Sequence, residues 1–534
     1  MPTAAWRVDF APARRAEAGR RTPWEKLALA HSHWPPAAKR AAARSDWLLV
    51  GAVVIYLLAN LPFLVAWPAV NGDEGREANA FWVASGVDPS AQTLDPVFRH
   101  DPLYKGGLQG LTTAISFRLF GLGLYQGRLV SLVWGGALLI MTFLAGRRLY
   151  GPVAGYVAVV FLAVSQPWLV SSHIIRPDIV VATLVMAGVY CALRGIQDGG
   201  RHWHLLAGLC LGLSFDVHPN TLAFMPMVGL CYVARYGWRA IFHRDAWLYV
   251  AGLIVGGLYY VAVRVAPDPI HFAEAFQYWI GVDKRPPALS TRGGGAIEAE
   301  LGRWTQYLNH RWMETALLAI GVVTAAIRMV RQRRVDPMLV GLLASLVVFT
   351  ILVSSKTEFY MILFFPALIL LVGAAISDVG DRLQGARLVA AALIVLLAVG
   401  VMGFEDNFRD IADAASNFED RDYAALSAGI QAAIPAGSKV IGPPVFWIGL
   451  NRSPYYLDYV DFYVWERMRR ERNVTWAQFV AEINPEYVLF DSKARSDVNN
   501  MSPRFMENNG ELVASFRHVN YTRVEVWKMR GAAR

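Results

Sequence analysis

An acidic pair, Asp73 and Glu74, follows the first long apolar segment of the chain and opens the run GREANAFWVASG. The run has apolar residues at helical spacing and is rich in aromatic side chains, which predicts an amphipathic helix lying on a membrane surface. The dipole of such a helix would help to keep carboxylates in its first turn ionised and available for acid–base chemistry. The structural alternative is that Asp73 is only the N-cap of the helix and Glu77 is its capping-box partner.

Four further polar segments contain residue types that bind anions or move protons. They are HDPLYK at 100–105, SSHIIRPD at 171–178, FDVHPN at 215–220 and SSKTEFY at 354–360. Their candidate site residues are His100, Lys105, His173, Arg176, Asp178, His218, Lys356 and Tyr360. Ionisable groups at the end of a membrane span are costly if they enter the hydrocarbon, so they tend to mark a site. The alternative is a set of ordinary interfacial loops, in which the histidines are structural and Asp178 merely starts a helix after Pro177.

The composition indicates the kind of protein that carries these residues. The chain has 534 residues, of which 55% are hydrophobic and 17% charged, and its mean hydropathy is +0.33. This balance does not suit a soluble domain and predicts a polytopic all-α membrane domain. Eleven apolar segments have the length of a membrane span, at about 47–69, 127–146, 152–171, 178–195, 203–216, 219–235, 246–265, 312–330, 338–354, 359–377 and 387–404. The net charge of +9 comes from short basic clusters between these segments, which argues against a nucleic-acid partner.

The basic residues accumulate in alternate loops between the apolar segments, as the positive-inside rule requires. In the short loops on the opposite side of the membrane, the only Lys or Arg residues are Arg176 and Lys356. This pattern predicts that the basic tail, residues 1–46, lies in the cytoplasm. The loops at 70–126 and 266–311 and all residues beyond 405 are then expected to lie outside. All the candidate site residues then lie on the outer face. The Ala-, Arg- and Val-rich composition indicates the cytoplasmic (inner) membrane of a bacterium.

Residues 405–534 have dispersed charge and turn residues, unlike the apolar part of the chain. The alternating segments KVIG, EYVLFDS, ELVASF and RVEVWKM predict strands, and helices are expected near 421–433 and 475–483, so this part is predicted to form a small extracytoplasmic α/β domain. Within 47–404, the stretch 103–121 is predicted to be a re-entrant or interfacial helix. The 266–311 loop is either a mobile lid over the site or a loop resting on the membrane.

Motifs in a fixed order follow the acidic pair. They are HDPLYKGGLQ, AISFRLFG, GRLVSLVWGG, GRRLYG and SSHIIRPD. In these motifs the chain resembles the GT-C glycosyltransferases, in the group that contains the lipid A aminoarabinose transferase and the protein O-mannosyltransferases. The resemblance covers about 70–235 and returns weakly in SSKTEFYMILFFPALILL. Asp101 and Val130 depart from the family, which usually has proline at both positions.

The resemblance implies a GT-C fold with about 11 transmembrane helices and an inverting sugar transfer. A polyprenyl-phosphate sugar would be the donor, and a lipid, glycan or protein the acceptor. Asp73 would be the base, and Glu74 would orient groups or tune the pKa of Asp73. The residues expected to bind the donor phosphate are Lys105, Arg176 and Lys356, in preference to His100, His173 and His218. Asp178 would orient a substrate group or a cation. Tyr360 belongs to a family pattern in a late span. No ligand spacing demands a metal, so a divalent ion is a candidate cofactor and not a requirement.

Two functions from other classes compete with this hypothesis. A transporter or flippase of an anionic lipid-linked substrate would normally show internal repeats and charges near the bilayer midplane. The sequence shows no such repeat, and its polar clusters gather at one face. A non-catalytic membrane subunit would instead bind a partner protein through the external α/β domain.

Overall fold

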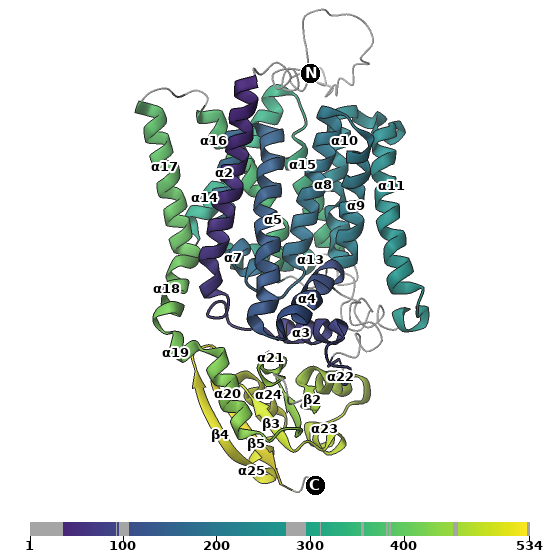
Figure 1. Cartoon of the computed structure of the whole chain (residues 1–534), viewed down its shortest axis with the longest axis vertical. Helices are drawn as coiled ribbons and strands as arrows, with labels where there is room; N and C mark the ends of the chain where they lie inside the picture. The colour runs from purple at the N-terminus through teal and green to yellow at the C-terminus, as the bar shows by residue number, and fades with distance from the viewer. Residues whose placement is uncertain are drawn as a thin grey trace, which may run out of the picture.

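A bundle of helices stands on a smaller α/β domain (Figure 1). This computed structural model describes residues 36–91, 93–94, 106–273, 295–309, 311–353, 357–380, 383, 386–451 and 458–530. The bundle contains α2 (Pro36–Asn60), α5 (Leu124–Tyr150), α6 (Pro152–Val164), α7 (Gln166–Ser172), α8 (Asp178–Asp198), α9 (Arg201–Val217), α10 (Met225–Tyr236), α11 (Arg244–Tyr260), α14 (Trp312–Gln332), α15 (Pro337–Leu352), α16 (Phe365–Gly380) and α17 (Ala386–Gly403). Short turns of helix join or extend them at η1 (Leu61–Phe63), η3 (Pro219–Phe224), η4 (Gly237–Phe242), η5 (Val261–Val265), η6 (Glu358–Leu363) and η7 (Phe404–Phe408).

Each of the eleven apolar segments proposed as spans contains helix. Among the described residues, four helices are long and apolar enough to cross a membrane, namely Leu124–Tyr150, Asp178–Asp198, Arg244–Val265 and Trp312–Gln332. The pair α6 and α7 meets the same criterion together but is bent by 64° at its junction. These helices, with several shorter apolar ones, make the chain a multi-pass membrane protein. The count of eleven spans stays a prediction.

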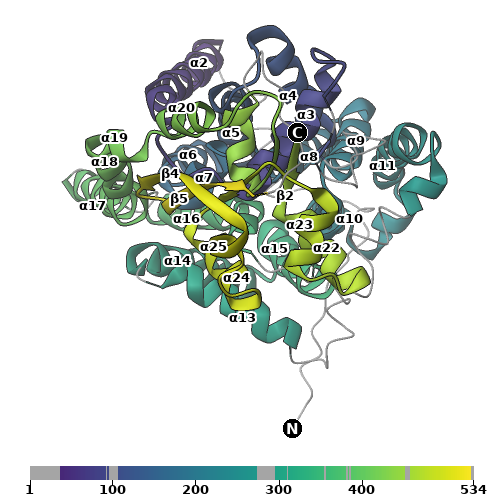
Figure 2. The ribbon, with the colours of Figure 1, turned by 90° about the horizontal axis from the view of Figure 1, so that it is seen from below.

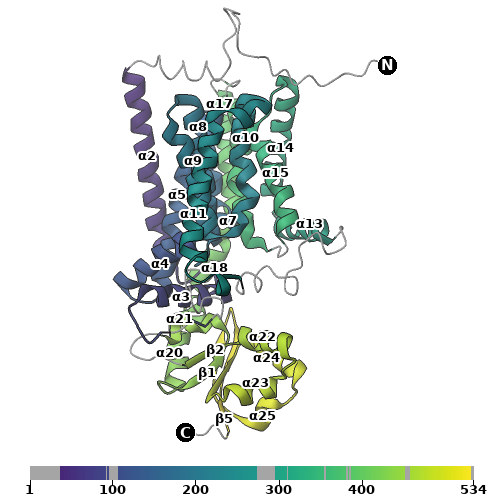
Figure 3. The same ribbon diagram turned by 90° about the vertical axis from the view of Figure 1, so that its right-hand side faces the viewer.

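Two short helices lie across the lower end of the bundle, between it and the α/β domain (Figure 3). They are α3 (Gly72–Ser85) and α4 (Gly107–Phe120), with 14 residues each. Fourteen residues span only about 21 Å, which is too short to cross the hydrocarbon. Leu111, Ile115 and Leu119 are exposed at four-residue spacing along α4. This apolar stripe fits the interfacial alternative that the sequence predicts for 103–121.

The helices α9 and α11 pack closely because each has two glycines four residues apart. A Cβ atom at Gly208 would lie 1.9 Å from the carbonyl oxygen of Tyr249, and one at Gly256 would lie 2.5 Å from the Cα of Gly212. Small residues at this spacing let helix backbones approach each other inside a membrane. The contact brings the C-terminal end of α9 close to η5, which continues α11, and these two segments carry the buried ion pair between Asp216 and Arg264.

The C-terminal domain contains a five-stranded sheet in the order β2-β1-β3-β5-β4. The strands are β1 (Lys439–Gly442), β2 (Asp458–Asp461), β3 (Tyr487–Phe490), β4 (Gly510–His518) and β5 (Thr522–Met529), of which β1 is parallel to β2 and β3. Its helices are α18 (Arg409–Ser416), α19 (Phe418–Arg421), α20 (Tyr423–Ala433), η8 (Pro444–Phe446), α21 (Trp447–Leu450), α22 (Phe462–Arg472), α23 (Trp476–Ile483), α24 (Ser492–Met501) and α25 (Phe505–Asn509). The four predicted strands and both predicted helices are present, whereas β2 was not predicted.

The C-terminal domain covers the middle of the lower end of the bundle, with α2 and α11 near the rim (Figure 2). One hydrophobic cluster joins the two parts. Phe81 of α3 and Phe117 of α4 belong to the same buried cluster as Trp447 and Tyr521 of the C-terminal domain. The helix α3, which carries the acidic pair, is therefore packed on both sides.

Candidate active site

The first turn of α3 is held by a capping box. The side chain of Asn71 accepts a hydrogen bond from the backbone N–H of Asp73 at 2.7 Å, and the N–H of Asn71 donates to Glu74 Oε2 at 3.0 Å. The alternative in which Asp73 caps the helix with Glu77 as its partner is therefore wrong. The cap starts two residues earlier, so the Asp73 carboxylate is not used for capping.

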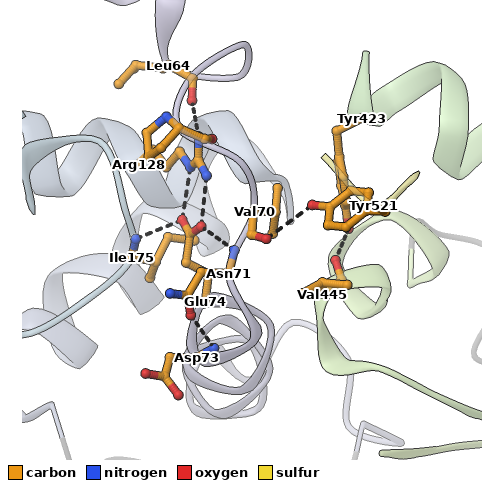
Figure 4. A network of polar contacts seen from close by, with 11 residues as sticks. Leu64, Val70, Asn71, Asp73, Glu74, Arg128, Ile175, Tyr423, Val445 and Tyr521 are labelled. Carbon is orange, nitrogen blue, oxygen red and sulfur yellow. Dashed lines mark hydrogen bonds and ion pairs between the residues drawn. The ribbon is translucent and has the colours of Figure 1, made fainter. Parts of the chain in front are cut away.

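Glu74 is fully buried and bound on both oxygens (Figure 4). Arg128 of α5 donates from Nε to Oε1 at 2.9 Å and from Nη2 to Oε2 at 2.8 Å, and the N–H of Ile175 donates to Oε1 at 2.9 Å. The same arginine donates from Nη1 to the carbonyl oxygens of Leu64 and Pro68. A forked pair of this kind fixes both position and orientation. Glu74 thus orients the loop rather than facing a substrate.

Asp73 has the opposite environment. Its side chain is 45% exposed, and its carboxylate points away from the buried pair between Glu74 and Arg128 (Figure 4). Arg176 donates from Nη1 to Asp73 Oδ2, and Nη1 of Arg76, one turn further along α3, lies 3.8 Å from Asp73 Oδ1. This carboxylate is accessible and is held between two guanidinium groups.

Arg176 lies in the loop between α7 and α8. Its Nε donates to Asp178 Oδ2 at 2.9 Å, and its guanidinium lies 4.6 Å from the ring centre of Phe359. Burial opposes the charge of Arg176, but Asp178 and Asp73 outweigh it and raise its pKa above the ordinary value. The structure therefore brings Asp73, Arg176 and Asp178 together, with the arginine shared between two carboxylates.

The two described histidine candidates make local contacts. Nδ1 of the fully buried His173 lies 2.7 Å from the carbonyl oxygen of Leu169. His218 accepts a hydrogen bond from the N–H of Asn220 at 3.1 Å, and its ring lies 6.2 Å from that of Tyr360. These contacts fit the structural alternative for both histidines. Tyr360 is buried in η6, immediately after Phe359.

Three predicted site residues, His100, Lys105 and Lys356, lie outside the described residues. The described chain resumes at Gly106, and the N–H of this glycine donates to the carbonyl oxygen of Val217 at 3.1 Å. A Cβ at Gly107 would lie 2.4 Å from a carboxylate oxygen of Asp216. Asp216 is buried and accepts a hydrogen bond from Arg264 Nε at 3.0 Å. The segment that begins at Gly106 is thus anchored on the C-terminal end of α9.

Sequence reasoning missed Arg128, Asp216 and Arg264 as site residues. Arg128 lies in GRLVS and Asp216 in FDVHPN, so both occur in segments that the sequence singled out. An arginine or aspartate predicted inside or at the end of a span is the signal that could have marked them, because such a charge needs a partner.

The described residues contain no group of three or more His, Cys, Asp or Glu side chains able to hold a metal ion. Part of the 266–311 loop is described as α13 (Gly295–Leu308). Its Tyr307 is buried, and the ring lies 5.5 Å from that of Phe365 in α16. This helix packs on the bundle, whereas 274–294 lie outside the described residues.

Comparisons with known proteins show what the fold of this chain is similar to. A family model for dolichyl-phosphate-mannose-protein mannosyltransferases matches residues 108–263. The apo structure of ArnT from Cupriavidus metallidurans matches with a TM-score of 0.61 at 17% identity, covering 92% of this chain and 99% of ArnT. The chain has the GT-C fold. The resemblance to GT-C glycosyltransferases that the ordered motifs carry is confirmed.

Two further structures share the GT-C fold with this chain. ArnT from the same organism bound to undecaprenyl phosphate matches with a TM-score of 0.59 at 16% identity, over 91% of this chain and 98% of ArnT. An oligosaccharyltransferase from Archaeoglobus fulgidus tethered to an acceptor peptide matches with a TM-score of 0.50 at 14% identity, over 91% of this chain and 74% of the other. No curated protein sequence matches this chain significantly.

Proposed function

We propose that this chain is an inverting glycosyltransferase that moves a sugar from a polyprenyl-phosphate donor to a lipid, glycan or protein acceptor. The observation that carries the proposal is the exposed carboxylate of Asp73, which stands on a rigid frame formed by Glu74 and Arg128. The GT-C fold shared with ArnT, one structure of which contains undecaprenyl phosphate, supports a lipid-phosphate donor.

The proposed reaction needs one base and no general acid, because a phosphate leaves readily from the sugar. Asp73 takes the proton of the acceptor group as that group bonds to the anomeric carbon, and the bond from that carbon to the phosphate oxygen breaks. Polyprenyl phosphate leaves with the bond electrons. Two carboxylates facing each other across the bond, as in a glycosidase, are not required.

The departing phosphate needs cations beside it. Asp73 and Asp178 already share the guanidinium of Arg176, which favours a role for Arg176 in positioning the base. In our proposal, Lys105 and Lys356 are the principal phosphate ligands, and Tyr360, adjacent to Phe359, lines the same region. The proposed reaction face is the outer side of the cytoplasmic membrane, with the N-terminal tail inside and the C-terminal domain outside.

The position of four ion pairs near helix ends favours a transferase over a transporter. Arg128–Glu74 and Arg264–Asp216 lie near helix ends on the side of the bundle that carries Asp73, and Arg148–Asp198 and Arg328–Asp336 lie near the opposite ends of helices. A transporter would need such groups near the middle of the membrane, where they could bind a solute in transit.

The experiment is sugar transfer by purified protein offered a panel of lipid-phosphate sugars, with products analysed by mass spectrometry. Asp73→Asn keeps the size of the side chain and removes the base, so transfer should fall by at least about 100-fold, in the range typical of a general base. Binding of the lipid donor should change little. The matched control is Asp88→Asn, in the loop that follows α3, where Asp88 contacts only its neighbour Ser90 among the side-chain interactions of the described residues.

Full activity of Asp73→Asn would remove the base assignment. Absence of transfer by the wild-type protein with every lipid-phosphate donor, together with transport of the same lipids across vesicles, would favour the transporter instead.

A further inference from the structure

The C-terminal domain packs closely against α3, the helix that carries Asp73. A Cβ atom at Gly75 would lie 1.9 Å from the carbonyl oxygen of Pro444, so only glycine allows this approach. The hydroxyl of Tyr521 donates to the carbonyl oxygen of Val70 at 3.1 Å, just before α3 begins (Figure 4). Burial raises the pKa of Tyr521 well above its ordinary value, which keeps the hydroxyl protonated as a donor. The position of α3 thus depends on residues far away in the chain.

The side chain of Arg76 connects the C-terminal domain to the carboxylate of Asp73. Arg76 lies one turn after Asp73, and its guanidinium lies 4.4 Å from the ring centre of Tyr463 in α22. Nε of Arg76 lies 3.4 Å from Oδ2 of Asp461, whose side chain is fully buried at the end of β2. Arg76 therefore lies between Asp73 on its own helix and Asp461 on the C-terminal domain.

Asp73 lies between two similar ion pairs, each formed by an arginine and a second carboxylate. On the membrane side, Asp178 shares Arg176 with Asp73; on the other side, Asp461 shares Arg76 with it. Each guanidinium is thus offset by a second carboxylate. Without that offset, a guanidinium a few ångströms from Asp73 would stabilise the ionised carboxylate and make it a weaker base. Asp73 is thus ion-paired with both arginines, and the neighbouring Glu74 is paired with Arg128.

We infer that Asp461 is a positioning residue for Asp73 and acts through Arg76. Asp461 holds the Arg76 guanidinium by charge and Tyr463 holds it by stacking, so the arginine keeps its orientation while part of its field is offset. The inference rests on the proposed function, because it assumes that Asp73 is the base.

The test is the pH dependence of sugar transfer by three variants of the full-length protein. Asp461→Asn keeps the Oδ1 acceptor that caps α22 through the N–H of Val464 at 3.1 Å and removes only the charge facing Arg76. The acidic limb of kcat should move to lower pH by about one unit, since the offset to Arg76 is lost. Arg76→Gln should move the same limb to higher pH, because a cation near Asp73 is removed.

The double variant distinguishes this mechanism from a general structural effect. If Asp461 acts mainly by holding Arg76 in place, Asp461→Asn should produce a clearly smaller shift in the Arg76→Gln background than in the wild-type background. The control is Asp458→Asn, on the same strand but exposed and 3.8 Å from Lys439, which should leave the profile unchanged. The donor KM should stay within about twofold in all variants, because the phosphate ligands are not altered.

Two results would overturn the inference. One is an unshifted acidic limb in Asp461→Asn, and the other is a shift of equal size with and without Arg76. If Asp461→Asn does not fold, the Arg76→Gln variant still tests the inference. An unchanged acidic limb of kcat in that variant would contradict the role of Arg76. Activity of Asp73→Asn would instead defeat the proposed function itself, so the two failures are distinguishable.

Discussion

Asp73 and Glu74 are neighbours in the sequence with different tasks in the structure. Glu74 is buried and saturated by Arg128, Asn71 and Ile175, while Asp73 is half exposed. A helix start can support this division because consecutive side chains point in directions about 100° apart. The buried residue makes the loop rigid, and the exposed one is left for chemistry.

Replacement of Glu74 tests this division at the residue scale. Glu74→Gln keeps the shape but leaves the fully buried Arg128 without a counter-charge, which typically costs about 3–5 kcal/mol. We expect a clear drop in the thermal unfolding temperature of the detergent-solubilised protein, along with loss of transfer. Glu419→Gln, at an exposed position of α19, is the control. An unchanged unfolding temperature in Glu74→Gln would show that the pair does not hold the loop.

The helical elements could be predicted because a membrane span demands a long apolar segment, and helix occurs in every proposed one. Other features depend on contacts that a single sequence does not display. Glu74 and Arg128 are 54 residues apart, and either alone has the pattern of a surface charge. The strand β2, DYVD, begins and ends with aspartate, a residue type that is depleted in strands, so its composition does not indicate a strand. The structural alternative with Asp73 as the N-cap is wrong because Asn71, two residues earlier, is the N-cap and has Glu74 at the required three-residue spacing.

The glycine contact of α9 with α11 gives a prediction at the scale of elements. Gly256→Leu would force these helices apart, because a Cβ there lies 2.5 Å from the Cα of Gly212. We expect a loss of about 1–3 kcal/mol of stability, as for other overpacked sites. Transfer should fall too, since the same helices carry Asp216 and Arg264 beside Gly107. A Cβ atom at the adjacent Gly257 would meet no described atom within 4 Å, so Gly257→Leu should be tolerated. Equal unfolding temperatures for the two variants would refute the close-packing argument.

At the scale of the whole molecule, the C-terminal domain and the membrane bundle share one hydrophobic cluster through α3. Phe81 is fully buried in this cluster, together with Phe446 and Trp447 of the C-terminal domain. The C-terminal domain is therefore part of the support of the proposed site. A role in docking the acceptor would be additional to this support.

Truncation of the chain after residue 416 tests that support. The cut removes the packing partners of α3 that lie in the C-terminal domain, so we expect faster proteolysis near Ser85 and Gly86 at the end of the helix, and loss of transfer. Digestion of matched amounts of full-length and truncated protein, followed by mass spectrometry of the fragments, measures the effect. Unchanged protection of α3 in the truncated protein would mean that the bundle alone holds the helix.

The close approach of Pro444 to Gly75 has a consequence for protein engineering. Acceptor preference in enzymes of this architecture invites the exchange of external domains between relatives. A grafted domain with a different loop after its first strand would meet the backbone of α3 where no side chain fits. The exchangeable module is therefore not the C-terminal domain alone, but that domain together with residues 70–85.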